Sequence, residues 1–315
     1  MEELKLVPIY AGPPDKFPAS PELPEGVKTV TWTDEPGCMV DFNLDVVYDE
    51  RDGETLHLQI LLPLEGMFMF GEMPDKKYPL IVYVPGSAWR RQTPKLFLSR
   101  MARICERGYA VAVVEYRPSD VAGFPAQAED AKTAVRFMRK HADKYRIDPG
   151  KIALYGDSSG GHTVVLAGIT GDGLLDNGVY GEFSSEVNCI VNCFGPTDVS
   201  KMNYYPSMMD HTGADAPEGM LLGGVSVLEH PELAEKASPM HYLSREKAIP
   251  PMLILHGDQD WAVPFNQSVR LYEKMRELEK DVVMYKLLGG SHGFGGFNSI
   301  DARDTMLEFI AKHIG

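Results

Sequence analysis

The segment KIALYGDSSGGH (151–162) contains a serine in a setting that favours nucleophilic chemistry. Ser158 has glycine two positions before it and two positions after it, between an apolar run and a helical pattern. A nucleophile on such a sharp strand-to-helix turn leaves no room for side chains at Gly156 and Gly160. Ser159 lacks this spacing. Ser158 is therefore the predicted nucleophile.

A serine hydroxyl is a weak nucleophile, so it needs a basic histidine that is itself oriented by a carboxylate. The segment MLILHGDQDWAVP (252–264) offers two acids after an apolar run, Asp258 and Asp260. The H-G-x-x-D-x-x-V-P arrangement favours Asp260, with Asp258 as the alternative that forms loop hydrogen bonds. The predicted base is His292, in a glycine-rich loop 32 residues later (292 − 260), which completes the chain order Ser, acid, His.

The other histidines have no comparable motif around them. His162 follows the serine in the helical pattern and is interpreted as a packing residue that points away from it. His256 precedes the acid loop and is expected to be buried.

Attack on a carbonyl group also needs backbone N–H donors for the developing oxyanion. The predicted donors are the amides of Ser87, Ala88 and Ser159, the first two in the loop PGSAW (85–89). Three aromatic residues flank these motifs: Trp89, Trp261 and Phe294. They are candidates to stack on a sugar or an aromatic acyl group, and a role in the core is an equal alternative.

The elements that must position these residues follow from apolar runs and helical periodicity. Two alternating segments within 40–64, joined at Asp52-Gly53, predict an antiparallel pair. Short apolar runs then predict buried strands that alternate with helices. The strands are expected at 78–86, 109–117, 151–156, 189–195, 252–257 and 281–289, and the helices at 94–108, 126–145, 161–170, 266–278 and 302–314. This order predicts an α/β fold, with a mostly parallel central sheet, helices on both faces and N-terminal antiparallel edge strands.

Two segments depart from this rhythm, and neither carries a strand set of its own. Residues 1–40 are rich in proline and predict an arm or strap laid over a core, with a flexible tail as the alternative. Residues 196–250 are too long for a plain connection and predict a small helical insertion, or cap, over the C-terminal edge of the sheet. The whole chain, 1–315, is therefore expected to form one domain.

The charge balance excludes several classes of partner. The chain has 31 Lys and Arg against 45 Asp and Glu, a net charge of −14. Nucleic acids and anionic membranes are not expected partners, and the overall charge mildly disfavours strongly anionic substrates. Neither a secretory signal nor an apolar run of membrane-spanning length is expected. The four cysteines, Cys38, Cys105, Cys189 and Cys193, lack zinc-site spacing and are expected to be reduced and packed, which suits a cytoplasmic protein.

Taken together, several motifs over residues 75–315 resemble one family. PGSAW stands where that family usually has H-G-G-G-W, and EYRPS, SPMHYLS, HGDQDWAVP and GSHGF surround the serine motif. The set resembles the α/β-hydrolase esterases related to hormone-sensitive lipase, especially the bacterial feruloyl and acetyl-xylan esterase-like (BD-FAE-type) branch. The resemblance implies Ser158, Asp260 and His292 as the triad, Ser87 and Ala88 in the oxyanion hole, no cofactor or metal, and a monomer or small homo-oligomer.

The expected activity is that of a serine carboxylesterase acting on small-molecule or oligosaccharide esters, of the acetyl-xylan or feruloyl kind. The alternative is an arylformamidase resembling kynurenine formamidases. A serine peptidase is less favoured because no propeller-sized region precedes the catalytic part. A catalytically inactive binding protein on this fold is disfavoured by the intact Ser, Asp, His order.

Overall fold

A computed structural model of the chain describes residues 9–12, 16–20, 24–30, 39–64, 75–293 and 296–315. Its centre is an eight-stranded sheet in the order β1-β2-β4-β3-β5-β6-β7-β8. The pairs β1–β2 and β2–β4 are antiparallel and all the others are parallel. The strands are β1 (Met39–Arg51), β2 (Glu54–Leu64), β3 (Tyr78–Val84), β4 (Ala110–Val114), β5 (Ile147–Asp157), β6 (Cys189–Cys193), β7 (Met252–Gly257) and β8 (Val282–Leu287). The predicted mostly parallel sheet with antiparallel edge strands is confirmed.

The edge hairpin shows how local sequence fixes this part of the sheet. Asp52 and Gly53 have φ angles of 52° and 80°, which a type I′ turn requires at both central positions. Arg51 pairs with Glu54 directly across the turn. The predicted Asp52-Gly53 turn is therefore confirmed.

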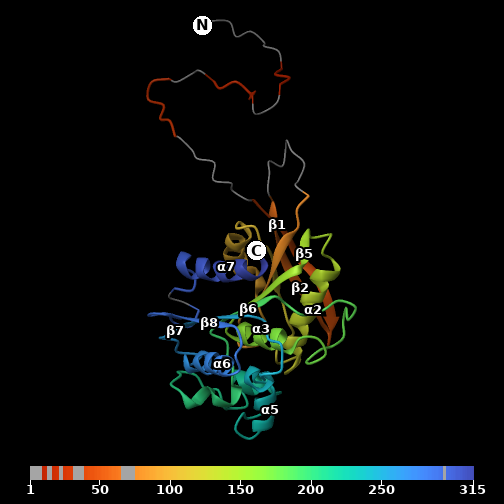
Figure 1. Ribbon diagram of the computed structural model, residues 1–315, viewed down its shortest axis with the longest axis vertical. Coiled ribbons are helices and arrows are strands. Elements are labelled where there is room, and N and C mark those ends of the chain that lie inside the picture. The colour runs from red at the N-terminus through yellow and green to blue at the C-terminus, as the bar shows by residue number, and fades with distance from the viewer. Residues whose placement is uncertain (1–8, 13–15, 21–23, 31–38, 65–74, 294–295) are drawn as a thin grey trace.

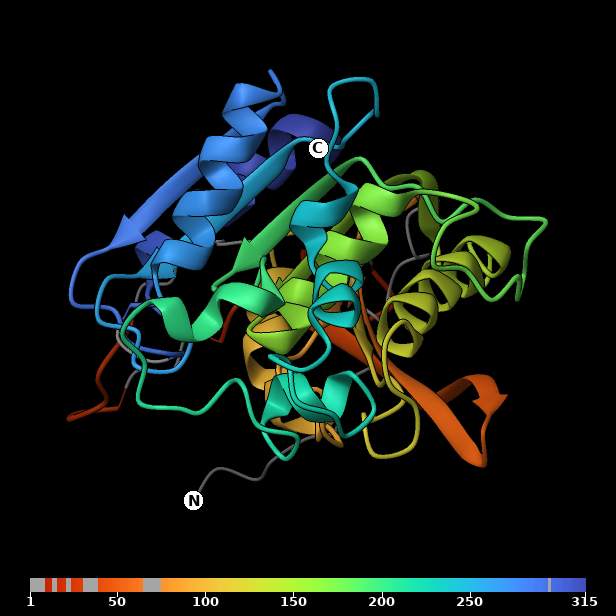
Figure 2. The same cartoon turned by 90° about the horizontal axis from the view of Figure 1, so that it is seen from below.

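Helices cover both faces of the sheet, as expected (Figure 1 and Figure 2). One face packs against α2 (Ala126–Lys140), α3 (Ser159–Thr170) and α6 (Asn266–Glu277), and the other against α1 (Leu98–Cys105) and α7 (Ile300–Ile314). The central strands are apolar because both of their faces are buried. The segment predicted as one helix over 94–108 is a 3₁₀ turn, η2 (Pro94–Phe97), followed by α1.

The insertion after β6 forms short helices, as predicted: η3 (Val199–Tyr204), α4 (Pro217–Leu221), α5 (Pro231–Lys236) and η4 (Pro239–Tyr242). Its amide at Met208 donates to the carbonyl oxygen of Trp261, 2.8 Å away, in the loop that follows β7. The insertion therefore lies against a loop at the carboxyl edge of the sheet.

The N-terminal arm differs from the prediction. Its described residues between 9 and 30 are exposed, and Figure 1 shows them extending from the end of the molecule opposite α5. These parts of the arm are therefore not laid over the core.

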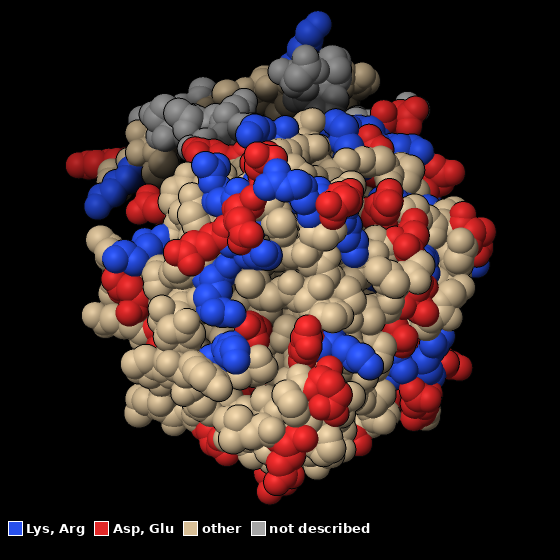
Figure 3. Space-filling model, turned by 60° about the horizontal axis from the view of Figure 1, so that its bottom comes forward, with Lys and Arg blue, Asp and Glu red and all other residues tan. Residues whose placement is uncertain are grey.

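The surface and the cysteines agree with the sequence. Lys and Arg are interspersed with Asp and Glu on the face drawn in Figure 3. Cys105, Cys189 and Cys193 are buried and form no disulfide among the described residues, as predicted, whereas Cys38 lies outside the described residues. In the described part of the chain, we find no helix with the length and apolar character needed to cross a bilayer.

Candidate active site

Ser158 occupies the turn between β5 and α3 in a strained backbone conformation. Its φ and ψ angles are 53° and −128°, in the region of positive φ that residues with a side chain rarely adopt. The turn is crowded. A Cβ atom on Gly156 would lie 2.3 Å from the carbonyl oxygen of Gly160, and one on Gly160 would lie 2.0 Å from that of Val84. The predicted steric need for glycine on both sides of Ser158 is confirmed.

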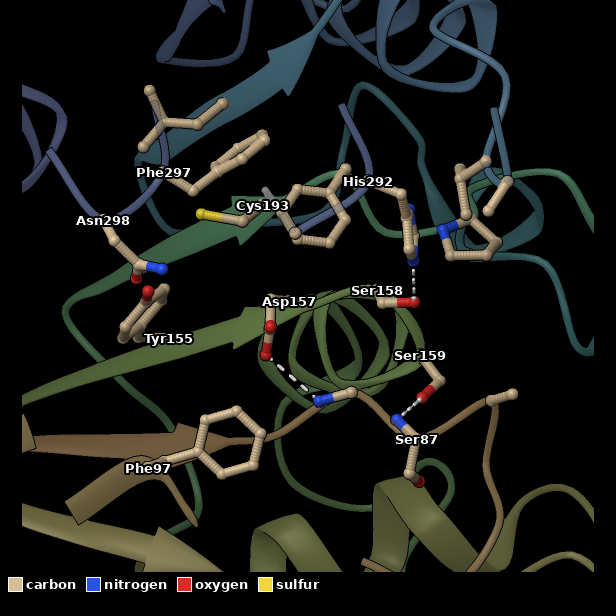
Figure 4. Close-up of a pocket in the computed structure, with 18 of the residues that line it drawn as sticks. Ser87, Phe97, Tyr155, Asp157, Ser158, Ser159, Cys193, His292, Phe297 and Asn298 are labelled. Carbon is tan, nitrogen blue, oxygen red and sulfur yellow. Dashed lines mark hydrogen bonds between the residues drawn. The ribbon is translucent and has the colours of Figure 1, made fainter. Parts of the chain in front are cut away.

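The structure brings Ser158 together with the predicted base and acid. The Ser158 Oγ atom lies 3.0 Å from Nε2 of His292 (Figure 4). The other ring nitrogen, Nδ1, lies 2.9 and 3.0 Å from the two carboxylate oxygens of Asp260. The His292 ring also packs against Phe194, with ring centroids 4.9 Å apart. The three side chains thus form a continuous hydrogen-bonded line from β5 to the loops after β7 and β8.

Asp260 is held as a buried carboxylate. Its Oδ1 accepts hydrogen bonds of 2.9 Å from the amides of Ala262 and Val263. Burial raises the pKa of Asp260, but hydrogen bonds from His256 and His292 outweigh this effect and bring the pKa to about 2. The buried His256, as predicted, lies beside it, with Nε2 3.3 Å from Oδ2. The carboxylate therefore remains ionised at neutral pH.

The alternative acid, Asp258, forms a hydrogen bond between loops instead. Its Oδ1 accepts a hydrogen bond of 2.7 Å from the amide of Gly289. This contact joins the loops after β7 and β8. The interpretation of Asp258 as a loop hydrogen-bonding residue is confirmed.

The loop after β3 requires one correction. The Ser87 amide donates a hydrogen bond of 2.8 Å to Oγ of Ser159, so this predicted oxyanion donor is already occupied (Figure 4). No acceptor for the Ala88 amide is found among the described residues. Ser159 is the first residue of α3, so its own amide has no acceptor within the helix. Of the three predicted donors, the amides of Ala88 and Ser159 are therefore available.

Trp89 also requires a correction, because its side chain belongs to the core. It is 1% exposed and packs in a cluster with residues of the insertion. Its indole N–H donates to Nδ1 of His162 at 3.1 Å, and Nε2 of His162 donates to the carbonyl oxygen of Ala237 at 2.7 Å. Burial lowers the pKa of His162 to about 4, which keeps the ring neutral. The predicted stacking of Trp89 on substrate is thus replaced by a link between the oxyanion loop and the insertion.

The chain matches the BD-FAE family model over residues 69–275. It belongs to the BD-FAE family. The esterase LipC of Mycobacterium tuberculosis is 29% identical over 226 residues, which are 71% of this chain and 55% of LipC. The chain spans about half the length of the curated relatives named as mycobacterial ester hydrolases (55%, 54% and 51%).

Solved structures extend this likeness to the fold. The BD-FAE chain superposes on a truncated carbohydrate esterase from gut microbiota with a TM-score of 0.75 and 30% identity, covering 89% of this chain and 98% of that one. It superposes on the propionate-bound esterase Est2 of Thermogutta terrifontis with a TM-score of 0.66 and 25% identity, covering 89% and 96%. The chain therefore has the α/β-hydrolase fold, as predicted.

In this BD-FAE protein, Ser158 and His292 line a cavity of about 610 Å³. Trp261 lines the cavity as well, is 44% exposed and lies with its ring 6.0 Å from that of His292. This placement leaves Trp261 accessible to a ligand. Phe294, the third aromatic candidate, lies outside the described residues.

Two walls of this cavity contain charged residues that the sequence did not reveal. The insertion contributes His211 and Glu218, and the pair α1 and α7 contributes Arg100, Arg103 and Arg303. The arginines belong to ordinary amphipathic helices, and His211 has no motif around it. Neither set produces a recognisable pattern in the amino-acid sequence. No group of three or more His, Cys, Asp or Glu residues in the described ranges is arranged to hold a metal ion.

Proposed function

We propose that this chain is a serine carboxylesterase that hydrolyses short-chain or carbohydrate-linked esters. The hydrogen-bonded line Ser158–His292–Asp260, at the wall of a large cavity, is the single observation that carries the proposal. The relatives named as esterases support the reaction class. The similarity to a carbohydrate esterase supports the carbohydrate-linked substrate.

In the first step, Oγ of Ser158 attacks the ester carbonyl carbon while Nε2 of His292 takes the hydroxyl proton. The carbonyl oxygen becomes an oxyanion, which the amides of Ala88 and Ser159 stabilise. When the tetrahedral intermediate collapses, the bond to the alcohol oxygen breaks. His292 returns the proton to that oxygen, and the alcohol leaves an acyl group on Ser158.

Water completes the cycle by the same route. His292 takes a proton from water as the water oxygen attacks the acyl carbon, and then returns the proton to Ser158 as the carboxylic acid leaves. Asp260 holds Nδ1 of His292 protonated, so that Nε2 is the nitrogen that accepts.

Turnover of p-nitrophenyl acetate and butyrate tests the reaction class. We expect Ser158→Ala to lower kcat by about 10⁵-fold or more, because losing the nucleophile disables the whole catalytic unit. Ser184→Ala, on an exposed loop away from the cavity, is the matched control. Failure of the wild-type chain to hydrolyse any ester or amide would overturn the proposal.

A substrate panel then tests the substrate class. Acetylated xylo-oligosaccharide, methyl ferulate and N-formylkynurenine separate acetyl esters, feruloyl esters and the alternative arylformamide substrates. We expect the highest kcat/KM on one of the two esters. A preference for N-formylkynurenine would assign the chain to arylformamide hydrolysis instead.

A further inference from the structure

The cavity reaches between α1 and α7 on one side of Ser158. Its lining here includes Ser99, Arg100, Arg103 and Ile104 from α1, and Ala302, Arg303 and Met306 from α7. These positions are three and four apart, so each set lies on one face of its helix. An ion pair of 3.1 Å between Arg107 and Asp304 joins the two helices. We call this part of the cavity the arginine arm.

Side chains along the strand edge connect the arginine arm to the serine. In Figure 4, Asp157 lies between Ser158 and the side chains of Tyr155 and Asn298, with Phe97 and Phe297 nearby, and it accepts a hydrogen bond from the loop after β3. The Arg100 guanidinium lies 5.4 Å from the centre of the Tyr155 ring and donates a hydrogen bond to the Tyr155 hydroxyl. A substrate attached to Ser158 can therefore extend along these side chains towards Arg100.

Carboxylates of the described residues balance little of the positive charge of these arginines. Neither Arg100 nor Arg103 pairs with a carboxylate in the described part of the chain. Among the described residues, the one carboxylate that pairs with Arg303 is that of its chain neighbour Asp304, at 3.4 Å, and Asp304 also pairs with Arg107. Each guanidinium has five N–H donors, so most of those on Arg100 and Arg103 remain available.

Two acids also line the cavity; Asp157 keeps its negative charge, but neither acid forms an ion pair with the three arginines in the described part of the chain, and the arginines outnumber them. Asp157 accepts hydrogen bonds from the Tyr83 hydroxyl at 2.8 Å and from the Gly86 amide at 3.0 Å. Glu218 pairs with His211 at 2.9 Å on the insertion wall. The arginine arm is thus locally basic in a chain whose net charge is −14. A local excess of the opposite sign inside a cavity selects a ligand more strongly than the net charge does.

We propose that the arginine arm binds a carboxylate carried by the ester substrate, an inference that rests on the proposed function. Guanidinium groups hold carboxylates through paired, charge-assisted hydrogen bonds. Apolar side chains such as Ile104 and Met306 surround the arm, so the contact is partly shielded from water. The carboxylate belongs either to the acyl group, as in a half-ester of a dicarboxylic acid, or to the alcohol, as in an acylated uronic acid.

Matched substrate pairs test the proposal and separate its two sources. Monomethyl glutarate against methyl butyrate tests the acyl group, and an acetylated glucuronic acid against the same acetylated xylose tests the alcohol. We expect kcat/KM for the anionic member to exceed that for the neutral member by about 10-fold in one pair at low salt. This preference should shrink as the salt concentration rises, because salt screens the interaction between a ligand carboxylate and solvent-accessible arginines.

Arginine variants locate the effect. We expect Arg100→Gln and Arg303→Gln each to lower the anionic-to-neutral ratio of kcat/KM by about 5-fold, mainly through KM. Arg276→Gln, at an exposed position of α6 and outside the cavity lining, should leave the ratio unchanged. No preference in either pair, or equal losses on both members of a pair, would overturn the subsite.

Binding without turnover separates this proposal from the reaction itself. Calorimetry with glutarate, which contains no ester, should show binding that is weakened about 5-fold in Arg100→Gln. If the wild-type chain hydrolyses no ester but binds glutarate in this way, the proposed reaction fails and the arginine arm stands. If esters are hydrolysed and glutarate does not bind, the arm fails and the reaction stands.

Discussion

The two charged walls of the cavity differ in how their charges are satisfied. On the insertion wall, His211 and Glu218 are each 2% exposed in their side chains and pair at 2.9 Å. On the opposite wall, Arg100 and Arg103 are less buried and have no carboxylate partner among the described residues. A buried charge without a partner is costly, whereas a partly solvated one is tolerated until a ligand arrives. The first wall is therefore built for structure and the second for recognition.

The insertion wall also contacts the loop that carries Asp260. Nε2 of His211 lies 3.0 Å from the carbonyl oxygen of Ala262, and the Ala262 amide donates to Asp260. Both ring nitrogens of His211 face acceptors, which favours the protonated ring. Burial lowers the pKa of His211, but Glu218 and the Ala262 carbonyl outweigh it, and the pKa is raised. The insertion thus supports the acid loop through the buried pair of His211 and Glu218.

Among the tests of this comparison, the largest expected effect is the loss of activity when Asp260, whose loop contacts the insertion wall, is changed. Asp260→Asn should lower kcat by about 10⁴-fold, because an amide no longer stabilises the protonated His292 or fixes its tautomer. Asp258→Asn is the matched control and should retain most of the activity. Steady-state kinetics on p-nitrophenyl butyrate measures both. Equal losses of kcat in the two variants would contradict the assignment of Asp260 alone as the acid. They would also contradict a connection between the insertion wall and catalysis.

A stability measurement tests the contrast between the two walls directly. We expect Glu218→Gln to lower the free energy of unfolding by about 3 kcal/mol, the lower end for a broken buried pair, since His211 can release its proton. Arg103→Gln should change it by less than about 0.5 kcal/mol, as for other surface changes. Urea denaturation gives both values. A large loss in Arg103→Gln would show that the arginine wall is also structural.

The pH dependence of stability also tests the insertion wall. The expected effect is smaller, but its direction is predicted. Because the folded pKa of His211 is raised above its ordinary value of 6.5, its pair with Glu218 stabilises the fold fully below that value. The stabilisation is lost as pH rises through the folded pKa. The difference in unfolding free energy between wild type and Glu218→Gln should therefore shrink from pH 6 towards higher pH. A difference that grows with pH would contradict a protonated His211.

The smallest expected effect concerns the link from the oxyanion loop to the insertion. Trp89→Phe removes the indole donor and leaves Nδ1 of His162 without that hydrogen bond, at a cost of about 1 kcal/mol in unfolding free energy. We also expect kcat to fall several-fold with little change in KM, because Ala88 precedes this residue. Trp261→Phe, an exposed change, is the control for stability. An unchanged kcat in Trp89→Phe would limit Trp89 to packing.

The sequence by itself determined the strands, the hairpin turn and the chain positions of Ser158, Asp260 and His292. These features depend on local causes: buried strands need continuous apolar runs, and the serine turn needs glycine at both flanking positions. The parallel order of strands then brings their carboxyl ends to one edge, where the three residues lie in hydrogen-bonding contact.

Only the tertiary structure decided what surrounds them. The Ser87 amide meets Ser159, 72 residues away, and the Trp89 indole meets His162, 73 residues away. The arginine arm joins α1 to α7, the last helix of the chain, and His211 meets Glu218 and Ala262 only in the folded structure. Which donor is occupied and which charge lacks a partner depend on contacts between distant segments, and composition or periodicity does not record those contacts.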